Sequence, residues 1–393
     1  MAENIANLNE IKSQALNAFL NEFGEEATHC VCAPGRVNVI GEHTDYNEGF
    51  VLPMALPMVT VIAGKPNATK ICTIISASSA VTSVSKAQFD ISDRSAIKPG
   101  DPKWANYVKG CVVNFPNSLT GFNAVVTSSV PVGAGLSSSA ALEVATFTFL
   151  EAITNQPVAD PVEKAILCQK AEHDFAGVPC GIMDQFISVM GKEGHALLLD
   201  CRDKSVVQIF MENLTNYVFL ITNSNAPHKL SSSAYRERRD ACFEAAKILG
   251  KKSLRDVSLE EIETLEKRGA SKVMLNRVRH VLNENLRTRA AMEALQAGDY
   301  ERVGDLMNAS HDSLRDNYEV SSPELDTLVN SARSVEGVLG SRLTGAGFGG
   351  CTITLLKEQS VSQVIDKIKQ TYTGNANFYI AKPSAGARQL DCR

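Results

Sequence analysis

The spacing of apolar positions along the chain predicts a mixture of helices and strands. Apolar residues at helical spacing run from residue 4 to residue 23, and Gly24 provides a stop. Further helices are predicted over 104–115, 140–150, 161–176, 182–190, much of 231–335, and 360–372. Strands are predicted over 59–63, 71–75, 124–130, 195–200, 217–223, 351–356 and 377–382. Because strands and helices occur in mixed order, we expect an α+β fold rather than a doubly wound sheet.

Length and composition narrow the class of protein. A chain of 393 residues predicts two domains, which we place at 1–225 and at 226–393, the second being helical and then β-rich. The formal net charge is -5 without a long run of one sign, which argues against nucleic acid or a membrane as partner. No stretch of about 18 apolar residues occurs and the ten cysteines are scattered, so we expect a cytoplasmic protein with free thiols. The oligomeric state stays open, with a monomer favoured.

The segment 33–49 is dense in charged and turn residues, which predicts a loop with a binding role. Within it, Glu42, His43 and Asp45 lie close to Tyr46 and offer the hydrogen-bonding groups that a polyhydroxylated ligand requires. An Asp and a His would also fit a metal site. The segment lacks the helical i, i+4 pair of a zinc protease, so sugar hydroxyls are the favoured ligand.

A second segment, 131–140, has the sequence Pro-Val-Gly-Ala-Gly-Leu-Ser-Ser-Ser-Ala between a predicted strand and a predicted helix. This order aims backbone N–H groups at an anion, so we interpret the segment, named here the serine loop, as a phosphate-binding loop. Ser137, Ser138 and Ser139 could cap the helix, bind phosphate oxygens or ligate Mg²⁺. A serine-capped helix without a ligand is the alternative. No Walker A or protein-kinase signature occurs, and the G-x-G-x-x-G match at 345–350 precedes a strand, which argues against dinucleotide binding.

Three charged residues are candidates for chemistry. Asp184 is a carboxylate among apolar residues, and such a charge is rarely left without a partner. We predict that Arg36 is that partner and holds Asp184 ionised. The alternative makes Asp184 a helix cap and Arg36 a solvated loop cation. Glu172 lies in a predicted helix and could reach Mg²⁺ opposite the serine loop, or could be an ordinary surface glutamate.

Together these segments resemble a known family. Residues 35–47, Gly-Arg-Val-Asn-Val-Ile-Gly-Glu-His-Thr-Asp-Tyr-Asn, resemble the galactokinase signature, and the serine loop and residues 341–350 resemble the second and third motifs of the GHMP kinases. The resemblance implies a two-domain GHMP kinase-like fold with the active site in the cleft between the domains. It also implies transfer of the γ-phosphoryl group of ATP to the anomeric hydroxyl of galactose, with Mg²⁺, giving galactose 1-phosphate and ADP.

Residue roles follow from the same resemblance. The implied catalytic pair is Arg36 and Asp184. The implied sugar contacts are Arg36, Glu42, His43, Asp45, Gly181, Asp184 and Tyr235. The implied ATP contacts are Trp104, Gly133, Gly135, Leu136, Ser137, Ser138 and Ser139, and the implied Mg²⁺ ligands are Ser138 and Glu172. Two positions depart from the pattern, since Ala134 and Ala346 stand where many relatives have Gly; we expect little effect unless the position needs a positive φ.

Two rival functions fit the same resemblance. An N-acetylgalactosamine kinase resembles galactokinases along its length, and Thr44 favours galactose only weakly. A non-catalytic sensor of galactose and ATP is the other rival. Because the serine run, Arg36 and Asp184 are all intact, the sequence favours an enzyme.

Overall fold

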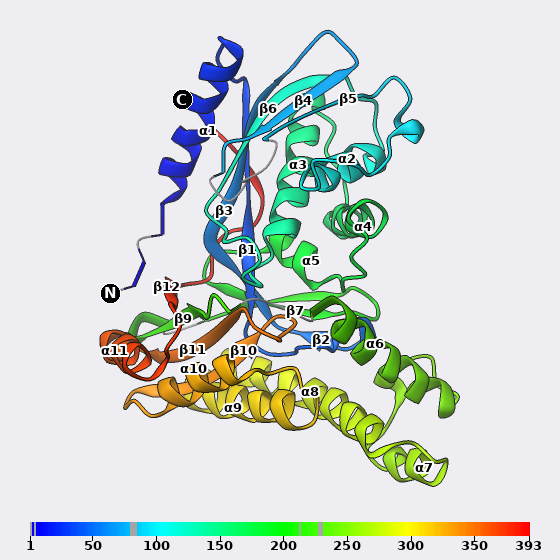
Figure 1. The fold of residues 1–393 in the computed structure, drawn as a ribbon, viewed down its shortest axis with the longest axis vertical. Helices are drawn as coiled ribbons and strands as arrows, with labels where there is room; N and C mark the ends of the chain where they lie inside the picture. Colours follow the sequence, from blue (N-terminus) through cyan, green and yellow to red (C-terminus); the bar gives the residue numbers. More distant parts are fainter. Residues whose placement is uncertain (1, 4, 79–84, 212–213, 227–230) are drawn as a thin grey trace.

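A six-stranded sheet forms the core of the first part of the molecule (Figure 1). The computed structural model describes residues 2–3, 5–78, 85–211, 214–226 and 231–393. The strand order is β13-β1-β3-β6-β4-β5, and all neighbours are antiparallel except β4 and β6. The strands are β1 (His29–Asn38), β3 (Pro53–Pro66), β4 (Ile71–Ser76), β5 (Lys86–Asp90), β6 (Phe122–Ser128) and β13 (Arg388–Leu390).

Helices cover both faces of this sheet, with α1 on one side and α2 to α5 on the other (Figure 1). Their bounds are α1 (Leu8–Phe23), α2 (Ala105–Asn114), α3 (Ser138–Thr154), α4 (Pro161–Ala171) and α5 (Met183–Met190). Alternate side chains of β1 point to opposite faces, as in any strand. Cys30 and Cys32 therefore pack with α1, whereas Val31 and Ala33 pack with α2 and α3.

The second part of the molecule is built on a four-stranded sheet of order β10-β11-β9-β12. Its strands are β9 (Tyr217–Asn223), β10 (Val338–Thr344), β11 (Cys351–Lys357) and β12 (Asn377–Ala381). The accompanying helices are α6 (Ser231–Ile248), α7 (Glu261–Lys267), α8 (Lys272–Gln296), α9 (Tyr300–Asp316), α10 (Pro323–Arg333) and α11 (Val361–Thr371). A small sheet of β2 (Phe50–Val51), β7 (His195–Asp200) and β8 (Val206–Phe210) lies at the junction of the two parts. In the part of the chain that the structure describes, no helix is both long and apolar enough to cross a bilayer.

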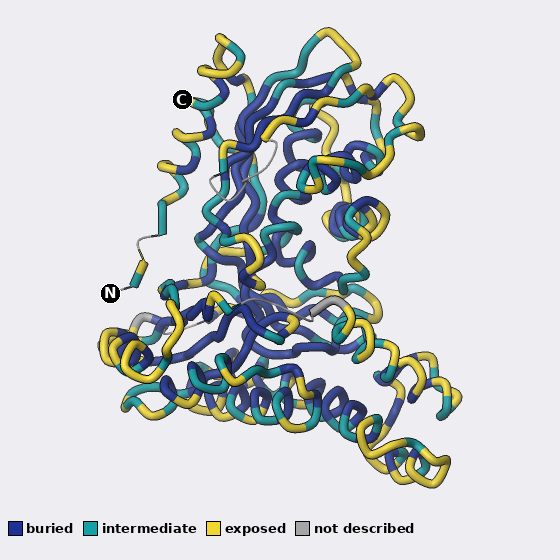
Figure 2. The backbone as a smooth tube through the Cα atoms, in the orientation of Figure 1, coloured by how far each residue is buried: buried dark blue, intermediate teal, exposed yellow. Residues whose placement is uncertain are grey.

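One cluster of buried side chains joins the two parts. Val37 and Leu52 from the first part share this cluster with Phe219, Val303 and Ile353 from the second. Figure 2 shows buried backbone continuing from the long strands into the second part. In an interior packed in this way the side chains interdigitate with few voids, so a shift of one residue displaces its neighbours. Residues at the junction are therefore held from both sides.

The structure corrects one expectation about the backbone. The segment 33–49 is not a loop throughout, because β1 continues to Asn38, with a bulge between Pro34 and Arg36. Two of its polar residues, Arg36 and Asn38, pair with β3, and local composition does not reveal such a distant partner. The domain division at residue 225 stays a prediction; in the structure β9 pairs within the second sheet, and β13, near the end of the chain, pairs within the first. The strands β2, β5, β8, β10 and β13 were not predicted.

Candidate active site

The serine loop connects β6 to α3, which begins at Ser138. Gly133, Gly135 and Ser137 have positive φ values of 73°, 76° and 62°. Glycine adopts this conformation without a steric penalty, whereas a serine there is uncommon and is found mainly where surrounding structure enforces it. Ala134 does not adopt a positive φ. Its methyl group therefore adds no backbone strain.

Ser137 does not cap α3. Its side chain makes no capping hydrogen bond, and its hydroxyl instead donates to the carboxylate of Asp184. The alternative of a serine-capped helix is therefore wrong for Ser137. The left-handed backbone at this residue turns the hydroxyl towards α5 and leaves the helix start without that cap, an arrangement suited to an anionic ligand.

Arg36 and Asp184 form a bidentate ion pair. The Arg36 Nε lies 2.8 Å from Oδ1 of Asp184, and Nη2 lies 2.9 Å from Oδ2. The remaining Arg36 nitrogen, Nη1, donates to the carbonyl of Gly135 at 2.6 Å. Arg36 is buried within β1, so it is not a solvated loop cation. Such parallel charge-assisted bonds fix both groups in orientation as well as distance.

Glu42 links the first motif (residues 35–47) to the third motif (residues 341–350). Its carboxylate accepts hydrogen bonds from Asn38 Nδ2 at 2.6 Å, from the Gly345 backbone N–H at 2.7 Å and from Thr344 Oγ1 at 3.2 Å. The side chain is only 2% exposed. A carboxylate has about four acceptor positions, so these contacts use most of them. Direct contact of Glu42 with a sugar stays a prediction.

His43, Tyr46, Tyr235 and Tyr318 gather at the junction of the two parts. Nδ1 of His43 lies 2.7 Å from the Tyr46 hydroxyl, and its Nε2 lies 3.1 Å from the Ala346 carbonyl. The Tyr235 ring lies 5.7 Å from the His43 ring and 5.5 Å from the Tyr46 ring, between centroids. Burial, and then the neighbouring His280, lowers the pKa of His43 to about 3, so the ring is neutral.

Asp45 and Gly181 lie against each other. A Cβ atom added at Gly181 would lie 1.5 Å from Oδ2 of Asp45, so only glycine leaves this carboxylate in place. Burial, followed by the nearby charges of Asp184 and Glu42, raises the pKa of Asp45 to about 7. The carboxyl is therefore poised between neutral and charged forms near neutral pH.

The raised pKa of Asp45 predicts a pH-dependent stability. Between the unfolded pKa of 3.8 and the folded pKa of about 7, the folded state binds the extra proton, so stability falls as pH rises. Asp45→Asn removes this titration. We expect the free energy of unfolding of the wild type to fall, relative to the variant, by about 2.5 kcal/mol from pH 5 to pH 8, measured by denaturant titration. Parallel pH curves for the two proteins would contradict the assignment.

Glu172 is buried, which excludes the surface alternative. It begins a π-helical turn over Glu172–Ala176, and its Oε2 accepts hydrogen bonds from Gln185 Nε2 at 2.8 Å and from Cys180 Sγ at 3.4 Å. The Ser139 hydroxyl also contacts this carboxylate. Burial, and then the charge of Asp184, raises its pKa to about 7. The Glu172 carboxylate is buried next to a serine hydroxyl and its hydrogen-bond partners are uncharged, which suits a ligand of Mg²⁺.

Sequence reasoning missed several polar residues that support these groups. Gln185 bridges Glu172 and Glu143 by donating to both, and no partner of Glu143 Oε1 lies among the described residues. Glu143 could have been identified from the sequence, because it is a charged residue within the apolar run 140–150. On α8, Glu284 accepts from the backbone N–H of Gly41 at 3.0 Å and so positions the first motif. No local pattern marks that contact.

Two further predicted positions lie at the edges of the site. Trp104 immediately precedes α2 and packs into the apolar cluster on the face of the first sheet that α2 to α5 cover. Ala346 stands between Gly345 and Gly347, whose φ values are 82° and 80°, but does not itself adopt a positive φ. As at Ala134, the extra methyl group therefore carries no backbone strain. The role of Trp104 in an adenine pocket stays a prediction.

Known families match the chain over these same segments. Residues 17–66 match the family model described as the galactokinase galactose-binding signature. Residues 106–192 match the N-terminal domain of GHMP kinases, and residues 291–374 match their C-terminal domain. The three matches contain the first motif, the serine loop and the third motif respectively.

Whole-chain relatives agree with these domains. The galactokinases of Canis lupus familiaris and Homo sapiens are 51% and 50% identical, each covering 97% of both chains. The structure of Lactococcus lactis galactokinase complexed with galactose superimposes with a TM-score of 0.89 at 35% identity, covering 95% of this chain and 98% of that one. A mevalonate kinase structure, at 20% identity and a TM-score of 0.64, shares the fold. The chain therefore belongs to the galactokinase family of the GHMP kinases.

Proposed function

We propose that this protein transfers the γ-phosphoryl group of ATP to the anomeric hydroxyl of galactose, giving galactose 1-phosphate and ADP. The observation that carries this proposal is the cluster of Arg36, Asp184 and Ser137. It joins the first motif, the start of α5 and the phosphate-binding serine loop at one point. A carboxylate held there lies where a sugar hydroxyl and a terminal phosphate would meet.

The sugar is bound, in this proposal, beside the first motif. Asp45, His43 and Tyr235 supply acceptors and donors for its hydroxyl groups, and Gly181 leaves room next to Asp45. The Lactococcus lactis relative is described in complex with galactose, which supports that sugar. Glu42 acts on the sugar site indirectly, because its contacts to Thr344 and Gly345 hold the first motif against the third.

The phosphates lie over the start of α3, where the helix dipole and backbone N–H groups favour negative charge. Asp184 receives the proton of the anomeric hydroxyl as the oxygen attacks the γ-phosphorus. Arg36 holds Asp184 in orientation through both carboxylate oxygens. Because the transition state of phosphoryl transfer is loose, positioning and electrostatic stabilisation carry much of the rate.

Ser138 and Glu172 would hold Mg²⁺. When bound, the ion would neutralise charge on the transferring phosphate. The described residues contain no group of three or more His, Cys, Asp or Glu side chains suited to a metal, so phosphate oxygens would complete its ligands. All ten cysteines are free, which supports a cytoplasmic location; a monomeric state stays a prediction.

A coupled assay of ADP release tests the proposal. The purified protein is given Mg·ATP with galactose, N-acetylgalactosamine, glucose or no sugar. We expect strong release with galactose only, together with galactose 1-phosphate as product. Preference for N-acetylgalactosamine would change the substrate, and binding of galactose and ATP without release would indicate a sensor.

A further inference from the structure

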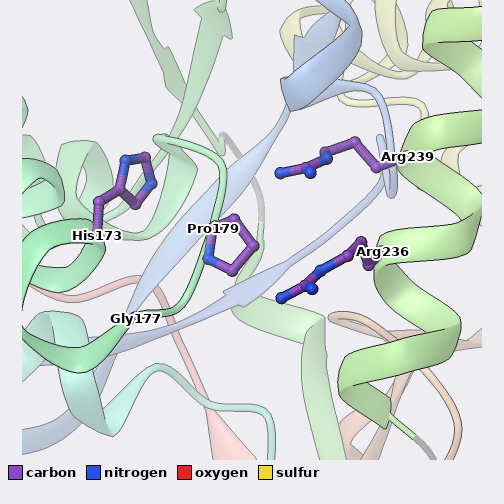
Figure 3. Close-up of a pocket in the computed structure, with 5 residues that line it drawn as sticks. All are labelled: His173, Gly177, Pro179, Arg236 and Arg239. Atoms are coloured by element: carbon purple, nitrogen blue, oxygen red, sulfur yellow. The ribbon is translucent and has the colours of Figure 1, made fainter.

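A cavity lined by basic side chains lies between α6 and the segment that follows α4 (Figure 3). Its volume is about 370 Å³, within the range of about 300 to 1,000 Å³ that is usual for small-ligand pockets. His173, Gly177 and Pro179 form one wall, and Arg236 and Arg239 of α6 form the other. Figure 3 shows both guanidinium groups directed across the cavity towards Pro179.

The two arginines have positive charge to offer a ligand. Among the described residues, Arg236 has no hydrogen-bond or ion-pair partner. Arg239 forms an ion pair with Asp240, at 3.3 Å between nitrogen and oxygen, and the Asp240 side chain is 57% exposed. An exposed pair of this kind is worth little. The Arg239 guanidinium also lies over the Phe243 ring, 5.6 Å from the centroid, a contact that leaves its charge uncompensated. The nearby acid Glu237 is engaged by Arg238.

The cavity adjoins the proposed sugar site. Pro179 comes two residues before Gly181, which contacts Asp45. On the other wall, Arg239 follows Tyr235 by four residues on α6, so the two side chains lie on one face of that helix. His173 Nε2 lies 2.9 Å from the Cys180 carbonyl and holds the intervening segment in place.

The charges of the two sites are opposite in sign. The proposed active site contains the carboxylates of Asp45, Asp184 and Glu172, and its Arg36 is already bonded to Asp184 and Gly135. A sugar phosphate carries close to two negative charges near neutral pH. Paired guanidinium groups next to such a site would attract a phosphate, since each presents a planar set of donors matched to its oxygens.

We propose that this cavity is a second phosphate-binding site, which takes a phosphate monoester dianion or free inorganic phosphate through Arg236 and Arg239. This proposal rests on the proposed function only for the natural source of the ligand, which would be the sugar phosphate released as product. Binding itself is independent of turnover.

Isothermal titration calorimetry with two probes tests the site. Inorganic phosphate and galactose 1-phosphate are titrated separately into protein saturated with galactose and Mg·AMP-PNP, so that the proposed active site is filled. We expect Arg236→Gln and Arg239→Gln each to weaken binding roughly tenfold, and the double variant about 100-fold. Lys247→Gln, in the last turn of the same helix, removes one positive charge away from the cavity and is expected to bind as the wild type does.

The outcomes separate the sources and the two proposals. If galactose 1-phosphate binds more tightly than inorganic phosphate, and the double variant loses that binding, the ligand is the sugar phosphate. If the two probes bind equally tightly and the double variant loses both, the ligand is free phosphate. Unchanged binding in the double variant, or no binding by the wild type, overturns the site. A protein that binds phosphate here but does not phosphorylate galactose loses the proposed function and retains the site.

Discussion

Replacement of Asp184 by Asn is expected to lower the kcat for galactose phosphorylation by at least about 10³-fold. The variant keeps the shape of the side chain and one oxygen that can accept from Arg36. It loses the proton acceptor and the charge that balances the buried guanidinium. Because Arg36 keeps its bond to the Gly135 carbonyl, we expect the free energy of unfolding to fall by only about 2 kcal/mol.

The measurement compares kcat and unfolding in the same preparations. Asp312→Asn is the matched control, because Asp312 also pairs with an arginine, Arg333, at 3.0 Å, in the second part of the molecule. The control should lose some stability and little activity. Turnover of Asp184→Asn within about tenfold of the wild type would remove Asp184 from the chemistry and leave it a structural partner of Arg36.

Elements with strong local signals were predictable from the sequence. The first helix was expected from residue 4 and is found as α1, with Asn7 and Glu10 forming a reciprocal cap and Gly24 in the left-handed conformation at its end. These are local hydrogen-bonding preferences, which do not need the rest of the fold. The serine loop was located for the same reason, since a strand, glycines and a helix start follow one another directly.

Features that depend on distant residues were predictable only in part. Arg36 and Asp184 are 148 positions apart, yet the apolar surroundings of Asp184 indicated that it needed a cation. The strand conformation of Arg36 was missed, because it depends on pairing with Ala55 of β3. Likewise the hydrogen bonds from Thr344 and Gly345 to Glu42 span about 300 positions, and nothing near Glu42 in the sequence marks them.

Replacement of Gly181 by Ala is expected to weaken galactose binding by roughly 100-fold while the protein stays folded. The new Cβ atom would overlap Oδ2 of Asp45, at 1.5 Å, and would come within 2.2 Å of its Cγ. The carboxyl group must then move, and a displacement of about 1 Å in a positioned group can cost that factor. Gly181 does not have a positive φ, so alanine strains no backbone and the clash falls on a side chain that can rotate.

Titration of galactose, with Mg·ATP binding measured in parallel, separates this effect from general damage. ATP binding should stay within about threefold of the wild type, because the serine loop is untouched, and the free energy of unfolding should fall by no more than about 2 kcal/mol. Gly100→Ala is the control, since an added Cβ there has its nearest contact at 3.7 Å, with Lys109 Nζ. If Gly181→Ala bound galactose as the wild type does, Asp45 would not be a sugar contact, and the proposed sugar site would have to move away from the 45–181 contact.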